Sequence, residues 1–157
     1  DFRSHLNILQ DCPANTCGSV KVINAYQNLT NTNMSWISNL WNASNIYVLN
    51  NGMLILVTGG WLGWWDSNHG GPIQIYIDVN GYKKKPNMAG KDLFVFELRP
   101  GNKLVPEGSM GTEGASYSSA CSNAGTATDN GFNCTLWAIQ DKSPDDPQKS
   151  YWMDFLP

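Results

Sequence analysis

The sequence predicts an α+β domain in which an N-terminal helix packs on one face of an antiparallel sheet, with loops joined by disulfides. Three observations predict this fold. Apolar residues recur at helical spacing over residues 1–10, β-type runs flank a polar turn within residues 73–98, and four cysteines are available for pairing. A chain of 157 residues suits one domain, residues 1–157, and is long enough to bury a core.

The predicted N-terminal helix rests on Phe2, Leu6 and Leu9, which would share one helical face up to about Gln10. Pro13 would end it, because proline disfavours helical geometry at the residue before it. A helix this short does not stand alone in water, so we expect it to be the tail of a longer helix that begins upstream. Residues 20–26 and 36–41 each show the apolar spacing of a further short helix.

Strands are predicted through the middle of the chain and once near its end. Asn50-Asn51-Gly52 separates the apolar runs 46–49 and 53–58, which is a strong hairpin signal. Further strands are expected at both ends of 73–98, at 103–105 and at 134–139. Residues 107–131 are rich in Gly, Ser, Thr and Ala and read as a surface loop, and the aromatic tail 151–156 is expected to dock on the body.

The turn between the two central strands has a composition that suits a metal. Asp78 and Asn80 offer hard oxygen ligands two residues apart, as at the start of a calcium loop, and Asp92 is placed to close the shell. The spacing is not that of an EF-hand, because its twelfth position is Ala89. The alternative is that Asp78, Asn80 and Asn87 bond only to the backbone of the loop.

The four cysteines predict two disulfides. No Cys-x-x-Cys occurs, so the spacing does not suit zinc. Proximity in sequence favours the pairs Cys12–Cys17 and Cys121–Cys134, and disulfides place a protein in the periplasm or beyond the cell. Four free, buried thiols are the alternative.

Trp61, Trp64 and Trp65 lie in a glycine-rich stretch, residues 59–72. They fit either an aromatic lid over the edge of the sheet or an exposed binding surface. The second interpretation leads to another class of function, a secreted module that binds carbohydrate or protein through these rings. Four Asn-x-Ser/Thr sequences, at Asn28, Asn33, Asn42 and Asn133, are compatible with a secreted glycoprotein.

Composition argues against several other classes. The net charge is −3, so no basic footprint for nucleic acid is present, and the one basic cluster is Lys83-Lys84-Lys85. The longest apolar run, residues 53–57, is far shorter than the ~20 residues of a membrane-spanning helix. Neither His5 nor His69 lies in a catalytic signature, so we expect no enzymatic activity.

One stretch resembles a known family. Residues 78–96 follow the pattern Asp-x-Asn-Gly-x-x-x-x-Pro-Asn-x-x-Gly-x-Asp-x-Phe-x-Phe, which resembles a segment of type IV pilin-like proteins. These are the pilins, minor pilins and pseudopilins of bacterial pili and type II secretion systems. Residues 131–141, with Tyr151-Trp152 near the end, resemble the Cys-containing C-terminal region of the same family. Together the two fragments cover roughly a quarter of the chain.

The resemblance implies a pilin-like fold and a structural function, that of a minor pilin or pseudopilin. Such a subunit would contact other pilin subunits in a filament and would be anchored in the inner membrane before assembly, through an apolar N-terminal helix that the sequence does not contain. It would end in the periplasm or in an extracellular filament, where members of the family serve adhesion, DNA uptake or protein secretion.

Overall fold

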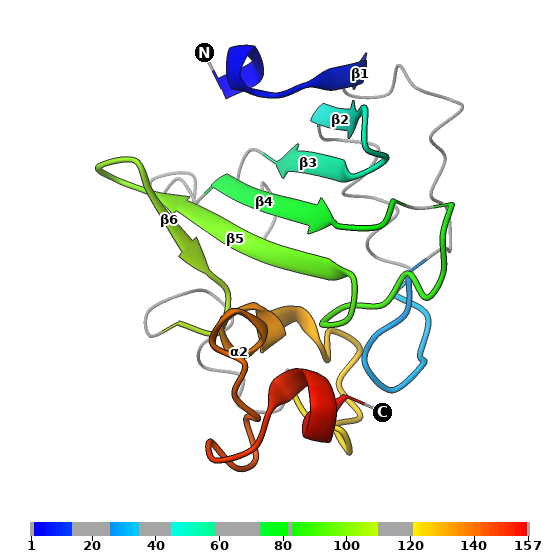
Figure 1. Ribbon diagram of the computed structural model, residues 1–157, viewed down its shortest axis with the longest axis vertical. Helices are drawn as coiled ribbons and strands as arrows, with labels where there is room; N and C mark the ends of the chain where they lie inside the picture. Colours follow the sequence, from blue (N-terminus) through cyan, green and yellow to red (C-terminus); the bar gives the residue numbers. More distant parts are fainter. Residues whose placement is uncertain are drawn as a thin grey trace.

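The computed structural model describes residues 2–13, 26–34, 45–58, 73–81, 83–109 and 121–156. Within them, six strands form one antiparallel sheet in the order β1-β2-β3-β4-β5-β6, so each strand pairs with its neighbours in the sequence (Figure 1). The strands are β1 (Ile8–Cys12), β2 (Asn45–Leu49), β3 (Leu54–Thr58), β4 (Ile73–Asp78), β5 (Leu93–Arg99) and β6 (Lys103–Pro106). The helical elements are the 3-10 helices η1 (Phe2–His5) and η4 (Phe132–Cys134), the α-helix α2 (Thr135–Gln140) and the single-turn π-helix η5 (Tyr151–Phe155).

The predicted α+β fold, with an N-terminal helix packed on the sheet, is wrong, because the described residues form mainly a six-stranded antiparallel sheet. Residues 8–12 are the edge strand β1, in which Ile8 pairs with Leu49 and Cys12 with Ile46 on β2, and only η1 is helical. Leu9, expected on the buried face of a helix, is instead 68% exposed. Strand pairing along β2 overrides the weak helical preference of so short a segment. The expectation that the residues up to Gln10 form the tail of a longer helix is wrong as well, because residues 8–12 form a strand.

The central strands follow the sequence closely. The β2–β3 connection is tight: Gly52 adopts φ 91°, and its amide donates to the carbonyl of Leu49 at 2.9 Å. Strands β4 and β5 pair along their whole length, with Ile75 opposite Phe96 and Ile77 opposite Phe94. Alternate residues of each strand therefore face opposite sides of the sheet.

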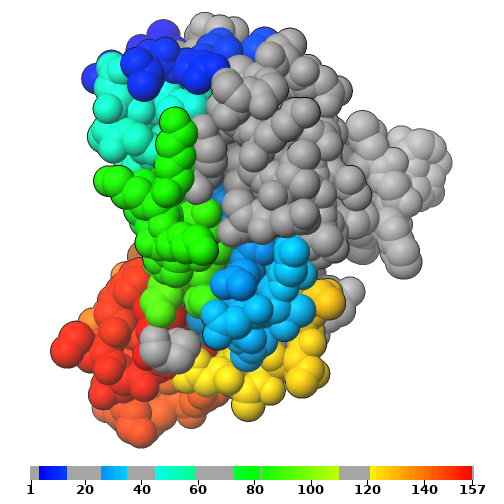
Figure 2. All heavy atoms as spheres, turned by 90° about the vertical axis from the view of Figure 1, so that its right-hand side faces the viewer, coloured from blue at the N-terminus to red at the C-terminus, as the bar shows by residue number. Residues whose placement is uncertain are grey.

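Residues 26–34 pack against one face of the sheet. Tyr26 and Met34 in this segment are 1% and 2% exposed and join a core built mainly from the strands. The other members of that core are Cys12, Ile46, Leu54, Leu56, Tyr76, Ala89, Leu93 and Val95. Figure 2 shows residues 26–34 in blue beside residues 121–131 in yellow, and the amide of Leu29 donates to the carbonyl of Asn130 at 2.9 Å.

The C-terminal residues pack beside β5, beneath it in the view of Figure 1. Residues 134–139 were predicted as a strand, but 135–140 form α2; a short apolar run does not distinguish a strand from a buried helical turn. The Thr135 hydroxyl accepts a hydrogen bond from the amide of Val95 at 2.9 Å, which ties α2 to β5. The aromatic tail docks as predicted, since Tyr151 is 0% and Phe155 3% exposed. None of the helices in the described ranges is long and apolar enough to cross a bilayer.

Candidate functional site

The face of the sheet opposite residues 26–34 is apolar from β1 to β5. We call it the apolar face, and it consists of Leu6, Ile8, Tyr47, Leu49, Ile55, Val57, Ile75, Ile77, Phe96 and Leu98. The strand register places these side chains in rows, with Tyr47 opposite Ile55 and Ile55 opposite Ile77. Every member except Leu6 comes from a strand.

No element of the described residues packs on the middle of this face. Its contacts are made within the sheet and with Leu6, except that Phe96 also packs on the C-terminal cluster that contains Ala138 and Tyr151. Figure 1 shows no described element in front of β2, β3 and β4. The central Tyr47, Ile55 and Ile75 are 6–7% exposed, whereas the members around them are partly exposed. Exposure rises toward the margin, where Ile73 is 40% exposed.

An apolar sheet face of this extent calls for a partner. Antiparallel sheets with one solvated face alternate apolar and polar residues along each strand. Here β3 reads Leu-Ile-Leu-Val-Thr, with apolar residues toward both faces. Contiguous apolar surface of this kind marks a site of interaction. The sequence did not point to the face, because its members are spread over five strands and meet only through the register.

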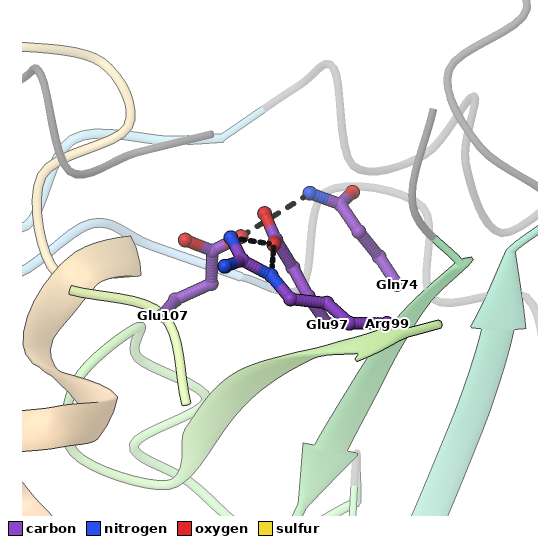
Figure 3. Close-up of polar contacts among 4 residues, drawn as sticks. All are labelled: Gln74, Glu97, Arg99 and Glu107. Carbon is purple, nitrogen blue, oxygen red and sulfur yellow. Dashed lines mark hydrogen bonds and ion pairs between the residues drawn. The ribbon is translucent and has the colours of Figure 1, made fainter. Parts of the chain in front are cut away.

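The other face carries a buried polar cluster, shown in Figure 3 and not predicted from the sequence. Glu97 and Glu107 are 1% and 0% exposed. The Arg99 guanidinium donates from Nε and Nη2 to Glu97 Oε2 at 3.0 and 2.7 Å, and Gln74 Nε2 donates to Glu107 Oε1 at 3.4 Å. A signal was present, since Gln74 and Glu97 each interrupt an apolar strand.

The contacts of this cluster support a structural role, in which it holds neighbouring strands together. Buried charges are retained when they are paired and hydrogen-bonded, and Glu97 meets both conditions through Arg99. Tyr76 extends the network, because its hydroxyl donates to Gln74 Oε1 at 2.9 Å. The register supports it too, since Gln74 lies directly opposite Glu97.

The predicted calcium residues do come together. Asp78 and Asp92 are 0% and 2% exposed, and Asn80 lies between them, donating from Nδ2 to Asp92 Oδ2 at 3.1 Å. Asp78 Oδ1 accepts from the amides of Asn80 and Gly81 at 3.2 and 2.7 Å. Asp92 accepts from the amide of Asn87 at 2.6 Å and from the amide of Met88. The two carboxylates thus organise the loop from both ends.

Burial is the largest influence on the pKa of both carboxyl groups. Loss of hydration raises the pKa of Asp78 and of Asp92 above the ordinary value of 3.8, and the hydrogen bonds they accept oppose this. The Tyr26 hydroxyl donates to Asp78 Oδ2, and burial, followed by the charge of Asp78, raises the pKa of this phenol. Tyr26 therefore stays protonated and remains a donor.

The loop agrees with the alternative drawn from the sequence only for Asp78, which accepts from the amides of Asn80 and Gly81, whereas the Asn80 side chain donates to the Asp92 carboxylate. The carboxylate oxygens that calcium would use already accept N–H and O–H donors. Within the described part of the chain, no group of three or more His, Cys, Asp or Glu side chains is placed to hold a metal. Calcium binding at Asp78, Asn80 and Asp92 stays a prediction, for which these donors would have to be displaced.

The remaining predicted sites are described in part. The Cys121–Cys134 disulfide is confirmed. Cys12 is disulfide-bonded, while Cys17 lies outside the described residues, so the pair Cys12–Cys17 stays a prediction. Trp61, Trp64 and Trp65 also lie outside them, as do the two short helices predicted at 20–26 and 36–41, except for Tyr26.

The glycosylation sequences are only partly usable in the folded protein. Asn28 and Asn133 are 0% and 5% exposed, so neither side chain is accessible to a glycan-transferring enzyme. Asn28 serves the fold instead, because its Oδ1 accepts from the amide of Thr32 at 2.7 Å. Asn33 is exposed, and Asn42 lies outside the described residues.

Comparison with protein-family models, with curated proteins and with solved structures finds no match. The resemblance to pilin-like proteins is therefore carried by residues 78–96 and 131–141 alone, and function has to be argued from the surfaces and clusters described above.

Proposed function

We propose that this domain is a structural subunit of an extracytoplasmic filament of the type IV pilin-like class. The apolar face carries the proposal, because a sheet that is apolar on both sides needs a partner on its second side. The Cys121–Cys134 disulfide supports a compartment outside the cytosol. The resemblance of residues 78–96 supports the family.

The partner that we propose for the apolar face is an apolar helix of a filament subunit. Residues 1–12 do not supply it, because they end in the edge strand of the same sheet. Complete burial of an aliphatic side chain contributes roughly 1.5–3 kcal/mol. The partly exposed members of the face contribute only part of this free energy. A helix that covers the face would bury the rest of their apolar surface and add the remainder.

A matched pair of substitutions tests the role of the face. Ile73 and Leu9 are both exposed apolar residues, at 40% and 68%, and both lie on strands. Neither residue is one of the ten members of the apolar face, but Ile73 lies at its margin, on the same side of β4 as Ile75 and Ile77. Ile73→Asp should exclude the subunit from filaments, and Leu9→Asp should not.

The measurement is made in the source cell. Surface filaments are sheared off, and the subunit is quantified by immunoblot in the sheared and cell-bound fractions. Thermal melts of both purified variants check that each still folds. Equal incorporation of Ile73→Asp and wild type, or absence of the wild-type protein from every sheared fraction, would overturn the proposal.

A further inference from the structure

The loop between β4 and β5 presents three consecutive lysines at a fixed place. Lys83, Lys84 and Lys85 are all exposed. The loop is anchored just before them, where the amide of Gly81 donates to the buried Asp78 at 2.7 Å, and just after them, where the amide of Asn87 donates to the buried Asp92 at 2.6 Å. We call residues 83–85 the lysine tip.

An acidic turn lies in another part of the chain. The segment 141–154 holds four aspartates and two lysines, and its turn, Asp145-Asp146, follows α2. Asp145 is exposed and Asp146 is partly exposed. In Figure 1 the green β4–β5 loop lies to the right of the sheet, and the orange-red turn of residues 141–150 lies at the lower left. The two charged regions of one molecule therefore do not meet.

We propose that the lysine tip of one subunit contacts the acidic turn at Asp145 and Asp146 of the next copy. This inference rests on the proposed function, and it names the contact between neighbouring copies in the filament. Because the contact joins two different surfaces, it is head-to-tail, and repetition of it yields a ring or an open filament rather than a closed dimer. Charge complementarity of this kind sets register and speeds association more than it adds affinity.

The magnitude of the contact limits how it can be observed. Exposed ion pairs contribute about 0.2–1 kcal/mol each and weaken when salt screens them. The isolated domain should therefore associate weakly, and a trapping method is needed. A carbodiimide joins an amine and a carboxylate that are in contact, through an amide bond formed with loss of water.

The first experiment mixes unlabelled and ¹⁵N-labelled protein, treats the mixture with carbodiimide at low salt, and maps the peptides by mass spectrometry. We expect mixed-isotope peptides that link Lys83, Lys84 or Lys85 to Asp145 or Asp146, with a yield at least severalfold lower in 0.5 M NaCl. Absence of such mixed-isotope links, or a yield that salt does not change, would overturn the inference.

The second experiment uses charge reversal. Lys84→Glu/Lys85→Glu and Asp145→Lys/Asp146→Lys should each lose the cross-link, because each variant alone opposes like charges. An equimolar mixture of the two should regain it, because the lysine tip of one variant then meets an acidic turn and the reversed tip of the other meets a basic one. Lys103→Glu, at an exposed site on β6, is the control and should keep the cross-link.

The outcomes separate this inference from the proposed function. Failure of the mixture to regain the cross-link removes the head-to-tail contact, even if Ile73→Asp blocks filament incorporation. Recovery in the mixture establishes the contact, even if Ile73→Asp enters the sheared fraction normally and the apolar face has another role.

Discussion

The hydroxyl of Tyr26 donates a hydrogen bond to the buried carboxylate of Asp78, which joins the segment that covers the sheet to the start of the β4–β5 loop. The two residues are 52 positions apart in the sequence. We expect Tyr26→Phe to lower the free energy of unfolding by about 1–3 kcal/mol, because a buried acceptor loses its donor. Urea denaturation measures this.

A double-mutant cycle with Asp78→Asn isolates the pair. The two substitutions together should cost less than the sum of the single costs, because the interaction is lost only once. Strict additivity would show that the hydroxyl and the carboxylate do not depend on one another.

The two buried aspartates predict a distinct pH dependence. Their pKa values are raised in the folded state by burial, so the folded protein favours their protonated forms. Their contribution to stability is therefore fully present below the ordinary aspartate pKa of 3.8 and is lost as the pH rises through the raised values. The stability difference between wild type and Asp78→Asn should shrink from pH 4 upward. A difference that grows with pH would contradict the assigned direction.

Calcium can be tested on the same loop. Because Asp78 and Asp92 already accept backbone and side-chain donors, we expect a chelator to leave the thermal melt of the wild type unchanged. Asp78→Ala should then be destabilised by the loss of these hydrogen bonds, by roughly 2–4 kcal/mol. A calcium-dependent rise in Tm that Asp78→Ala abolishes would instead establish the ion, since a ligand stabilises the state that binds it.

Two glycines with similar backbone conformations make a matched pair. Gly108 and Gly101 adopt φ 93° and 80°, but a Cβ on Gly108 would lie 2.2 Å from the carbonyl oxygen of Asn133, whereas nothing lies within 4 Å of one on Gly101. Gly101→Ala should cost about 1–2 kcal/mol for the left-handed backbone alone. Gly108→Ala should cost several kcal/mol more, because backbone cannot move aside. Equal urea midpoints for the two variants would show that residues 107–109 do not pack on η4.

The Cys121–Cys134 disulfide closes a short loop beside α2, with a sequence separation of 13 residues. Replacing both cysteines with serine should lower the free energy of unfolding by about 3 kcal/mol in the chain-entropy description. Non-reducing peptide mapping should recover this pair together with Cys12–Cys17. A Cys12–Cys134 or Cys17–Cys121 peptide would contradict the pairing.

The sequence predicted the centre of the sheet better than its ends. Strands β2 to β5 carry strong local signals, such as Asn51-Gly52 in the first hairpin and β-branched residues throughout β4. Residues 8–12 and 135–140 were misassigned because their conformation is decided by what they pair with. Residues 8–12 pair with β2 as an antiparallel strand, and the Thr135 hydroxyl accepts a hydrogen bond from the backbone of β5.

Of the candidate sites, the one whose residues are close in sequence was predicted, and those assembled from several strands were not. Asp78, Asn80 and Asp92 are close in sequence, and their convergence was predicted. In the structure the two aspartates accept hydrogen bonds that hold the loop, and Asn80 donates to both of them. The apolar face and the Glu97–Glu107 cluster were not predicted. Their members are brought together by strand register, which hydrophobic spacing within one segment does not specify.

The bond between Leu29 and Asn130 has a consequence for how the protein is made. Residues 26–34 pack on the first face of the sheet, yet they are held in place by residues 121–131, which are synthesised after every strand of the sheet. The hairpins of β2 to β5 can form earlier, and while they wait both of their apolar faces are open to water. The partly formed sheet should therefore be most prone to aggregation before residues 121–131 have been synthesised.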